Sequence, residues 1–148
     1  MSIKALLSAD HQQCDERFAQ AEAAVASHDW ATAASGLRAL TRGLEAHFLA
    51  EEEILFPAFE QASGMSTGPT AVMRLEHGQI RELLEALDQA LAAKEDEAFA
   101  GAVETLLILL QQHNQKEENI LYPMCDRLLD PDSLAGALRQ RLEADGND

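Results

Sequence analysis

Apolar residues recur at steps of three and four along most of this chain, which is the spacing of amphipathic helices. Ala and Leu together make up about a third of the residues, while Val, Ile and Thr are few, and this balance also favours helix over strand. The pattern predicts four long helices and a short one, over about Ser8–Ser27, Trp30–Ala62, Pro69–Ala93, Asp96–Pro123 and Asp132–Glu143.

The predicted boundaries carry the residues that usually end and begin helices. Asp29 and Asp96 are suitable N-caps, and Pro69 suits the first turn of a helix after the loop Ser63–Gly68. Pro57 is expected to kink or break the second helix. Because the connections are short, neighbouring helices should run antiparallel, which predicts an all-α, up-down-up-down four-helix bundle.

Length and charge narrow the class of protein further. The chain has 148 residues, 47% hydrophobic, enough for one domain (1–148) with a bundle core over about 7–129 and a C-terminal helix over about 132–143. We expect that helix to pack back on the bundle, with a dimer contact as the alternative. A net charge of −15 argues against nucleic acid and anionic membranes as partners.

Neither a membrane span nor a disulfide framework is expected. The longest uncharged apolar run, Leu106–Leu110, is five residues, and the N-terminus does not resemble a signal peptide. Cys14 and Cys125 do not form a C-x-x-C pair, and we interpret both as packing residues. These features predict a cytoplasmic protein, monomeric or weakly dimeric.

The sequence repeats itself at an offset of 66 residues, which indicates that one helical hairpin has been duplicated. The segment Ile54–Pro57 (ILFP) matches Ile120–Pro123 (ILYP). The other matched pairs are His11 with His77, Glu16 with Glu82, Leu40 with Leu106, Leu44 with Leu110, His47 with His113, Glu51 with Glu117 and Glu52 with Glu118.

Polar residues recur in this repeat on the apolar faces of the helices. Four histidines lie in phase with the leucines, and two of them begin an H-x-x-x-E motif, His47 with Glu51 and His113 with Glu117. A spacing of four residues places both side chains on one face, about 6 Å of rise apart. The inward-facing donors are His11, His47, Glu51, His77, His113 and Glu117.

Packing alone does not account for these six residues. A single histidine on an apolar stripe is usually a satisfied core residue, but six buried polar groups without partners would each cost roughly 1–3 kcal/mol, against a total stability of about 5–15 kcal/mol. Four imidazoles and two carboxylates suit two first-row metal ions that share the carboxylates. The absence of thiolates argues against structural zinc, and mixed nitrogen and oxygen donors favour iron, then manganese.

The ordered motifs resemble the hemerythrin-like (HHE cation-binding) domains, in the variant with four His and two Glu. They are Asp10-His11, His47-Phe48-x-x-Glu51-Glu52, Glu76-His77 and His113-x-x-x-Glu117-Glu118, and the resemblance covers about Leu7 to Pro123. It implies a four-helix bundle with two iron ions, bridged by an oxo or hydroxo group and two carboxylates, with manganese or zinc as possible substitutes. The six residues above match the family's ligand positions one by one.

Two features depart from the oxygen-carrying members. Arg81 stands four residues after His77, where the carriers have a further histidine, and Glu117 follows His113 by four residues rather than five. We expect Arg81 to hold a bridging carboxylate or an anionic ligand, to pair with Asp15, or simply to lie at the bundle edge with a solvated head. We expect Asp15 to accept a hydrogen bond from an imidazole, and a place as a spare ligand is the alternative. Glu52 and Glu118 should be solvated or act beyond the ligands, and Tyr122 and Phe56 should close the bundle end.

The leading functional hypothesis is a non-haem di-iron protein that binds or reacts with O2, NO or peroxide, in sensing, scavenging or stress response. The alternatives are a non-catalytic module for iron storage or delivery, and a bundle for protein contacts with a vestigial site. No hydrolytic or transferase motif is present, and whether the chain is an enzyme stays open.

Overall fold

The computed structural model describes residues 2–146 of this chain, with side chains described through residue 143. The described residues form helices joined by short connections, and no strand occurs among them. The elements are α1 (Ile3–Ala26), α2 (Trp30–Ala50), the π-helical turn η1 (Glu51–Leu55), α3 (Phe56–Ser63), α4 (Pro69–Ala92), α5 (Asp96–Lys116), the π-helical turn η2 (Glu117–Leu121), α6 (Tyr122–Leu128) and α7 (Pro131–Gly146).

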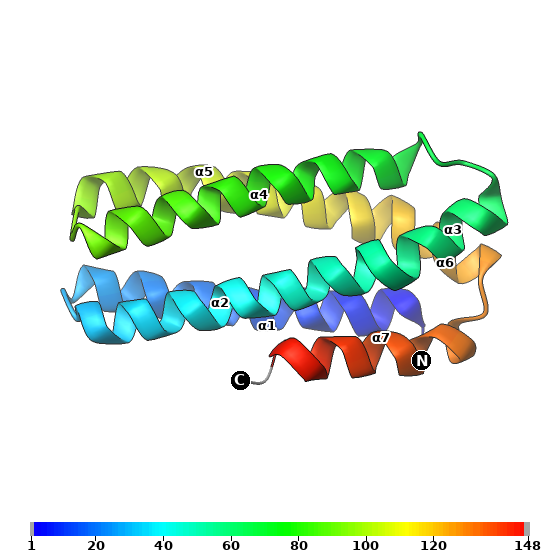
Figure 1. The fold of residues 1–148 in the computed structure, drawn as a ribbon, viewed down its shortest axis with the longest axis horizontal. Helices are drawn as coiled ribbons and strands as arrows, with labels where there is room; N and C mark the ends of the chain where they lie inside the picture. Colours follow the sequence, from blue (N-terminus) through cyan, green and yellow to red (C-terminus); the bar gives the residue numbers. More distant parts are fainter. Residues whose placement is uncertain (1, 147–148) are drawn as a thin grey trace.

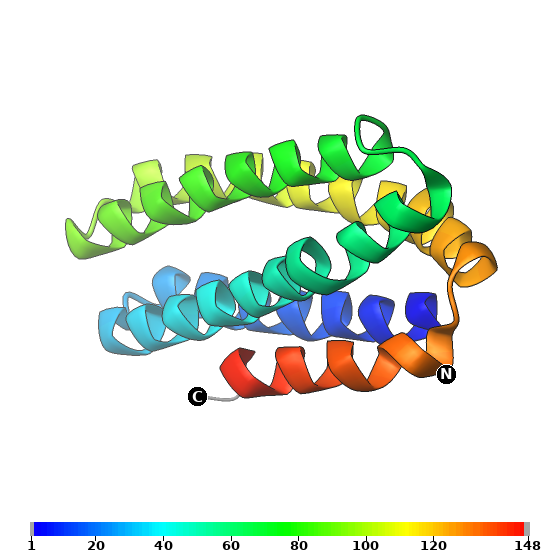
Figure 2. The ribbon, with the colours of Figure 1, turned by 45° about the vertical axis from the view of Figure 1, so that its right-hand side comes forward.

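Four rods run along the long axis of the molecule, each antiparallel to the next one along the chain (Figure 1). They are α1, α2 continued by η1 and α3, α4, and α5 continued by η2 and α6. This arrangement confirms the predicted all-α four-helix bundle. Figures 1 and 2 both show α7 lying along the outside of the bundle beside α1 and α2.

The C-terminal helix packs back on the bundle. Leu138 is completely buried in the same apolar cluster as Ile3 and Leu7, and Leu134 and Leu142 lie partly buried against it. The helix is longer than expected, since it begins at Pro131 and reaches Gly146.

The first helix also begins earlier than expected, at Ile3 rather than about Ser8. The Ser2 hydroxyl accepts a hydrogen bond from the Ala5 N–H, and the Asp126 carboxylate accepts from the N–H groups of Ile3 and Lys4. Three N–H groups of the first turn, which have no partner inside the helix, are satisfied in this way.

Pro57 does not break the second rod. The π-helical turn η1 ends just before it, with the Phe56 N–H donating to the carbonyl of Glu51, and Pro57 falls in the first turn of α3, where a missing N–H is tolerated. Pro123 has the same place at the start of α6, so this rod runs on to Leu128 instead of ending at Pro123.

Each π-helical turn shifts which residues face inward. Ile120 stands three residues after the inward-facing Glu117, where an α-helix would bury it, but it is 55% exposed, while Leu121 is buried. In the first copy Leu55 is buried and Ile54 only partly so. A turn that contains an extra residue moves the inward face one position along the chain.

The duplication is visible in the backbone as well. His28 and Lys94, which are 66 residues apart, both have positive φ, 55° and 56°, just after the first helix of each hairpin. Asp29 caps α2 by accepting from the Thr32 N–H, as predicted. Asp96 does not cap α5, because its carboxylate instead accepts a hydrogen bond from the His28 ring, 2.8 Å away.

The core consists of two apolar clusters. One is built mainly on leucines such as Leu37, Leu40 and Leu106, and the other contains Phe56, Phe59 and Tyr122. In sequence, the predicted metal ligands lie between the leucines of the first cluster and the aromatic residues of the second. Apolar packing therefore holds the helices together on both sides of the polar centre.

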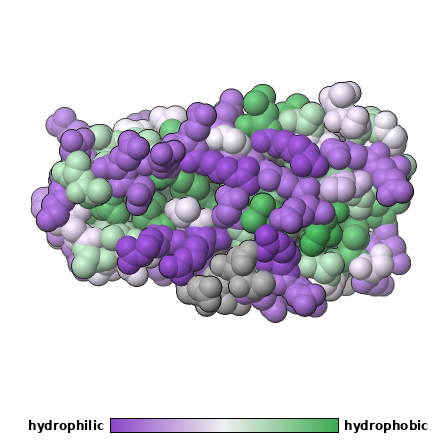
Figure 3. Space-filling model, viewed as in Figure 1, coloured by the Kyte–Doolittle hydropathy of each residue, from purple (hydrophilic) through white to green (hydrophobic). Residues whose placement is uncertain are grey.

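The outer surface is mostly hydrophilic on the face seen in Figure 3, with apolar side chains in separate patches. Exposed large apolar residues such as Leu75 and Ile108 belong to different helices. Among the described residues, none of the helices combines the length and the apolarity that crossing a membrane requires.

The leucine cluster should carry much of the stability without any metal. Leu106 is completely buried, so Leu106→Ala should lower the unfolding free energy of chelator-treated protein by about 2–5 kcal/mol, measured by urea unfolding. Ile108, two residues away and 52% exposed, is the control, and Ile108→Ala should change it by about 0.5 kcal/mol or less. Equal losses in both variants would contradict this assignment of the core.

Candidate metal centre

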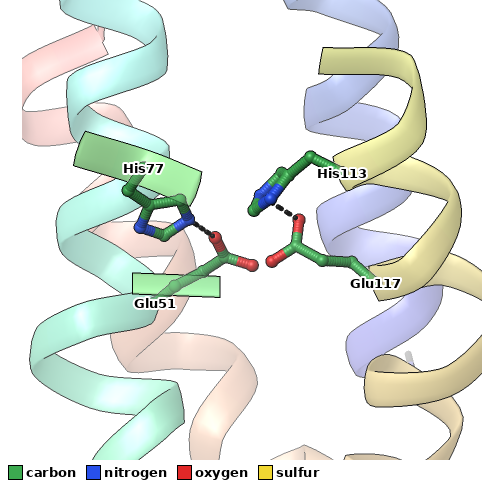
Figure 4. A group of neighbouring side chains, drawn as sticks. All are labelled: Glu51, His77, His113 and Glu117. Carbon is green, nitrogen blue, oxygen red and sulfur yellow. Dashed lines mark ion pairs between the residues drawn. The ribbon is translucent and has the colours of Figure 1, made fainter. Parts of the chain in front are cut away.

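Six polar side chains meet in the interior of the bundle, one each from α1 and α4 and two each from the rods containing α2 and α5. They are the sequence-predicted set His11, His47, Glu51, His77, His113 and Glu117, and none is more than 5% exposed. Figure 4 shows four of them, with the carboxylates of Glu51 and Glu117 pointing toward each other between the helices. The structure thus brings all six together.

Their donor atoms fall into two groups, each compact enough for one ion. The first group is His77, His113, Glu51 and Glu117, and the second is His11, His47 and Glu117. In the second group, His11 Nε2 lies 3.1 Å from His47 Nε2 and 3.2 Å from Glu117 Oε1. Neighbouring ligand atoms around a first-row ion, with bonds of about 2.0–2.2 Å, lie about 3 Å apart, so this spacing fits a metal ion.

Each carboxylate lies between imidazoles of the two groups. Glu51 Oε1 is 3.1 Å from His77 Nε2 and 3.6 Å from His47 Nε2. Glu117 Oε1 is 3.2 Å from His11 Nε2 and 3.3 Å from His113 Nε2. Each carboxylate therefore lies within 3.6 Å of one imidazole from each donor group.

Several of these buried donor atoms have no hydrogen-bond partner among the described residues. They are Glu51 Oε1, His77 Nε2, His113 Nε2 and Glu117 Oε2. The short contacts of the two imidazoles to carboxylates, dashed in Figure 4, are ion-pair distances without the angles of a hydrogen bond. Buried unsatisfied polar atoms are costly, and a metal cation would satisfy nitrogen and oxygen donors together.

The other ring nitrogen of every imidazole is held by a carboxylate. The Nδ1 atoms lie 2.7–2.9 Å from an oxygen of Glu118 for His11, Asp10 for His47, Glu52 for His77 and Glu76 for His113. These four contacts obey the sequence repeat. An Nδ1–H that donates to a carboxylate leaves the Nε2 lone pair free for a metal ion and fixes the ring orientation.

Glu52 and Glu118 thus act beyond the ligands, one of the two roles expected for them. Asp15 does not have the role expected for it, because the carboxylate that accepts a hydrogen bond from His11 is that of Glu118. Burial, opposed by the charge of His11, raises the pKa of the Asp15 carboxyl. Cys14 is buried in the leucine cluster, and burial raises the pKa of its thiol to about 12, which fits a packing residue.

Arg81 contacts neither Asp15 nor the inner carboxylates. Its guanidinium donates to both oxygens of Glu52 and both oxygens of Glu45, at 2.9–3.1 Å. Burial of Glu52 is outweighed by its bonds to His77 and Arg81, and the pKa of this carboxyl falls to about 2. Arg81 therefore keeps charged the carboxylate that orients His77.

The inner groups attract cations strongly in the absence of metal. Burial lowers the pKa of His47, but the Glu51 charge and the bond to Asp10 outweigh it and raise that pKa well above its usual value. For His113, burial is likewise outweighed by Glu117, and its pKa is raised to about 9. Glu51 is pulled the other way, since His47 and other neighbours outweigh burial and lower its pKa.

The π-helical turns are where the carboxylate ligand candidates sit. Glu51 is the first residue of η1 and Glu117 the first of η2. A single π turn inside a long helix is a recurring feature of functional sites. Here it brings Phe56, five residues after Glu51, onto the buried side of the rod together with Glu51 and Leu55.

Tyr122 is the residue of this centre that the sequence interpretation did not count among the inner polar groups. Its ring is buried at the bundle end, but its hydroxyl reaches the inner groups and donates to Glu51 Oε2 at 2.7 Å. The signal available in the sequence was the change from Phe56 to Tyr122 between the two copies of the ILFP segment.

Comparison with known proteins agrees with this geometry. The family model "Hemerythrin HHE cation binding domain" matches residues 2–125. Curated relatives include the iron-sulfur cluster repair protein YtfE of Salmonella schwarzengrund and of Salmonella paratyphi B, each 31% identical over 96 residues, which cover 59% of this chain and 44% of the relative. The chain thus spans less than half the length of these relatives, and no solved structure matches. Since the family model covers most of its length, the chain belongs to the hemerythrin HHE cation-binding family.

Proposed function

We propose that this chain holds two iron ions between its four rods and that the iron pair binds or reacts with a small oxygen or nitrogen species in a stress response. The ligands would be His11 and His47 for one ion and His77 and His113 for the other, with Glu51 and Glu117 shared. The observation that carries the proposal is the set of six buried donors, four of whose atoms have no hydrogen-bond partner among the described residues.

The donor set supports iron over the alternatives. Imidazole and carboxylate donors without thiolate suit iron or manganese, and bound iron would supply one-electron chemistry and open coordination positions. The protein's part is to hold the rings by their Nδ1 atoms and to limit water. Leu44, Ile80 and Leu110, all nearly inaccessible, wall the centre on one side.

A surface hollow beside His11 would give a small molecule or ion a route toward the centre. A hollow of about 450 Å³ opens between α1 and α5, and it is lined by polar residues that include His11, Asp15, Gln115 and Glu118. His11, at its base, is the most exposed of the six, although only 5%. Carboxylates at the mouth would favour cations, while uncharged O2 or NO would pass without an electrostatic barrier.

A second candidate function is iron delivery. The acidic residues beside this hollow and the net charge of −15 favour exchange of cations with the surroundings. The name of the relatives, iron-sulfur cluster repair protein, fits a role in which iron passes to an iron-sulfur protein. This candidate shares the metal site with the first and differs in what happens to the iron.

Iron content tests the site directly. Wild-type protein reconstituted without oxygen and then desalted should hold about two irons per chain, measured by elemental analysis. His47→Ala and His113→Ala should each lose most of one ion or both, because each removes a ligand and leaves polar neighbours unsatisfied. His28→Ala is the matched control, since His28 is exposed and pairs with Asp96. Equal iron content in all four proteins would contradict the assignment.

Reactivity separates the two candidate functions. Reduced, iron-loaded protein mixed with O2 or NO should change its visible absorption within the mixing experiment, and protein without iron should not. Under iron delivery the spectrum should stay unchanged, while a chelator removes the iron quickly. The measurement is stopped-flow absorption, with chelator transfer followed in parallel.

The metal-free protein should lose stability as the pH rises, and this loss should disappear when iron binds. The pKa of His113 is about 9 in the folded, metal-free chain and near 6.5 when unfolded, so the folded chain retains a proton between these values and loses stability as pH rises through them. A bound ion replaces that proton, so iron-loaded protein should show no such loss between pH 6.5 and 9. Urea unfolding midpoints at several pH values measure this, and parallel declines in both forms would refute it.

A further inference from the structure

Tyr122 and Phe56 occupy the same place in the two copies of the hairpin. Both rings are completely buried at the beginning of the helix that follows a π-helical turn. The Phe56 ring stacks near His77 with centroids 5.7 Å apart and planes at 20°, and the Tyr122 ring lies near His11 at 5.8 Å and 26°. The two sides therefore differ by a hydroxyl in equivalent positions.

That hydroxyl lies among the donors of one ion. Tyr122 Oη is 3.2 Å from His47 Nε2 and 3.3 Å from His11 Nε2. It is also 3.0 Å from Glu117 Oε1 and 2.7 Å from Glu51 Oε2. A phenol has one proton to donate, and the shortest contact assigns it to Glu51, so the other three atoms surround the oxygen without receiving that proton.

These distances match those of atoms bound to a common ion. The proposed donors His11 Nε2, His47 Nε2 and Glu117 Oε1 are 3.1–3.2 Å apart where they contact, and Tyr122 Oη lies 3.0–3.3 Å from the same three atoms. Ligands at about 2.0–2.2 Å from a first-row ion have this mutual spacing. The phenol oxygen is placed as one more member of the His11 and His47 group.

We propose that Tyr122 is a further ligand of the ion held by His11 and His47, so that the two metal positions are inequivalent. This inference rests on the proposed function. On binding a ferric ion the Oη–H bond breaks, the proton leaves to solvent, and the oxygen donates an electron pair to the metal, with no change in oxidation state. The ion beside the Phe56 ring would have no such ligand.

A phenolate would also change the charge at one metal position. It would add negative charge next to His11 and His47, and the Phe56 ring adds none beside His77. The phenolate charge would therefore favour the ferric state at the tyrosine side.

The chain offers a clean spectroscopic test because it contains one tyrosine. Ferric protein with two irons bound should show a visible phenolate-to-iron absorption band and, on excitation in that band, resonance Raman vibrations of a phenolate ring. Any such signal comes from Tyr122. Wild-type protein that holds its iron without these vibrations overturns the inference and leaves the proposed function standing, whereas protein that takes up no iron removes both.

Variants built on the repeat then confirm the place of the ligand. Tyr122→Phe should lose the band and Phe56→Tyr should raise its intensity about two-fold, because the equivalent ring then carries a hydroxyl too. The double exchange Tyr122→Phe with Phe56→Tyr should restore a band of wild-type intensity from the other half. Iron content and far-UV circular dichroism are measured for each variant, and a band that persists in iron-loaded Tyr122→Phe contradicts the proposal.

Discussion

The burial of four imidazoles and two carboxylates inside an apolar bundle is the constraint on which the rest of this structure depends. Each of these groups loses water on folding, and each unsatisfied one would cost roughly 1–3 kcal/mol. The structure meets part of this cost with a carboxylate on each Nδ1 atom, and two of these carboxylates, Glu52 and Glu76, are held in turn by Arg81 and Lys116. The remaining donor atoms face one another, and a pair of cations is the partner they suit.

Duplication explains how one short chain presents so many donors at one place. A hairpin supplies two imidazoles and a carboxylate, and its second copy supplies the same set from the opposite side of the bundle. The copies have diverged around the centre, at Tyr122 against Phe56, Arg81 against Asp15, and Lys116 against Ala50. These replacements change charge and hydrogen bonding, so the two halves offer metal ions different surroundings while the backbone stays symmetric.

The helices were predictable because their signals are local. Apolar spacing, Asp29 as a cap and the proline after the long loop all act within a few residues, and the observed elements agree with them. The π-helical turns were not predictable in this way. Their effect is that Ile120 is exposed and Leu121 is buried. Which of the two residues faces inward depends on contacts with the other helices, and an apolar spacing of three and four residues does not predict it.

By itself the sequence determined which side chains share a helix face: His47 with Glu51 and His113 with Glu117 lie four residues apart, and helix geometry allows them few other relations. Through the repeat, the sequence also identified His11 and His77 as equivalent candidate ligands. Only the tertiary structure decided which carboxylate meets which imidazole, because Asp10 with His47 and Glu118 with His11 join residues on different helices. The place of the Tyr122 hydroxyl was decided in the same way, since packing of the bundle end, rather than chain spacing, brings it to the centre.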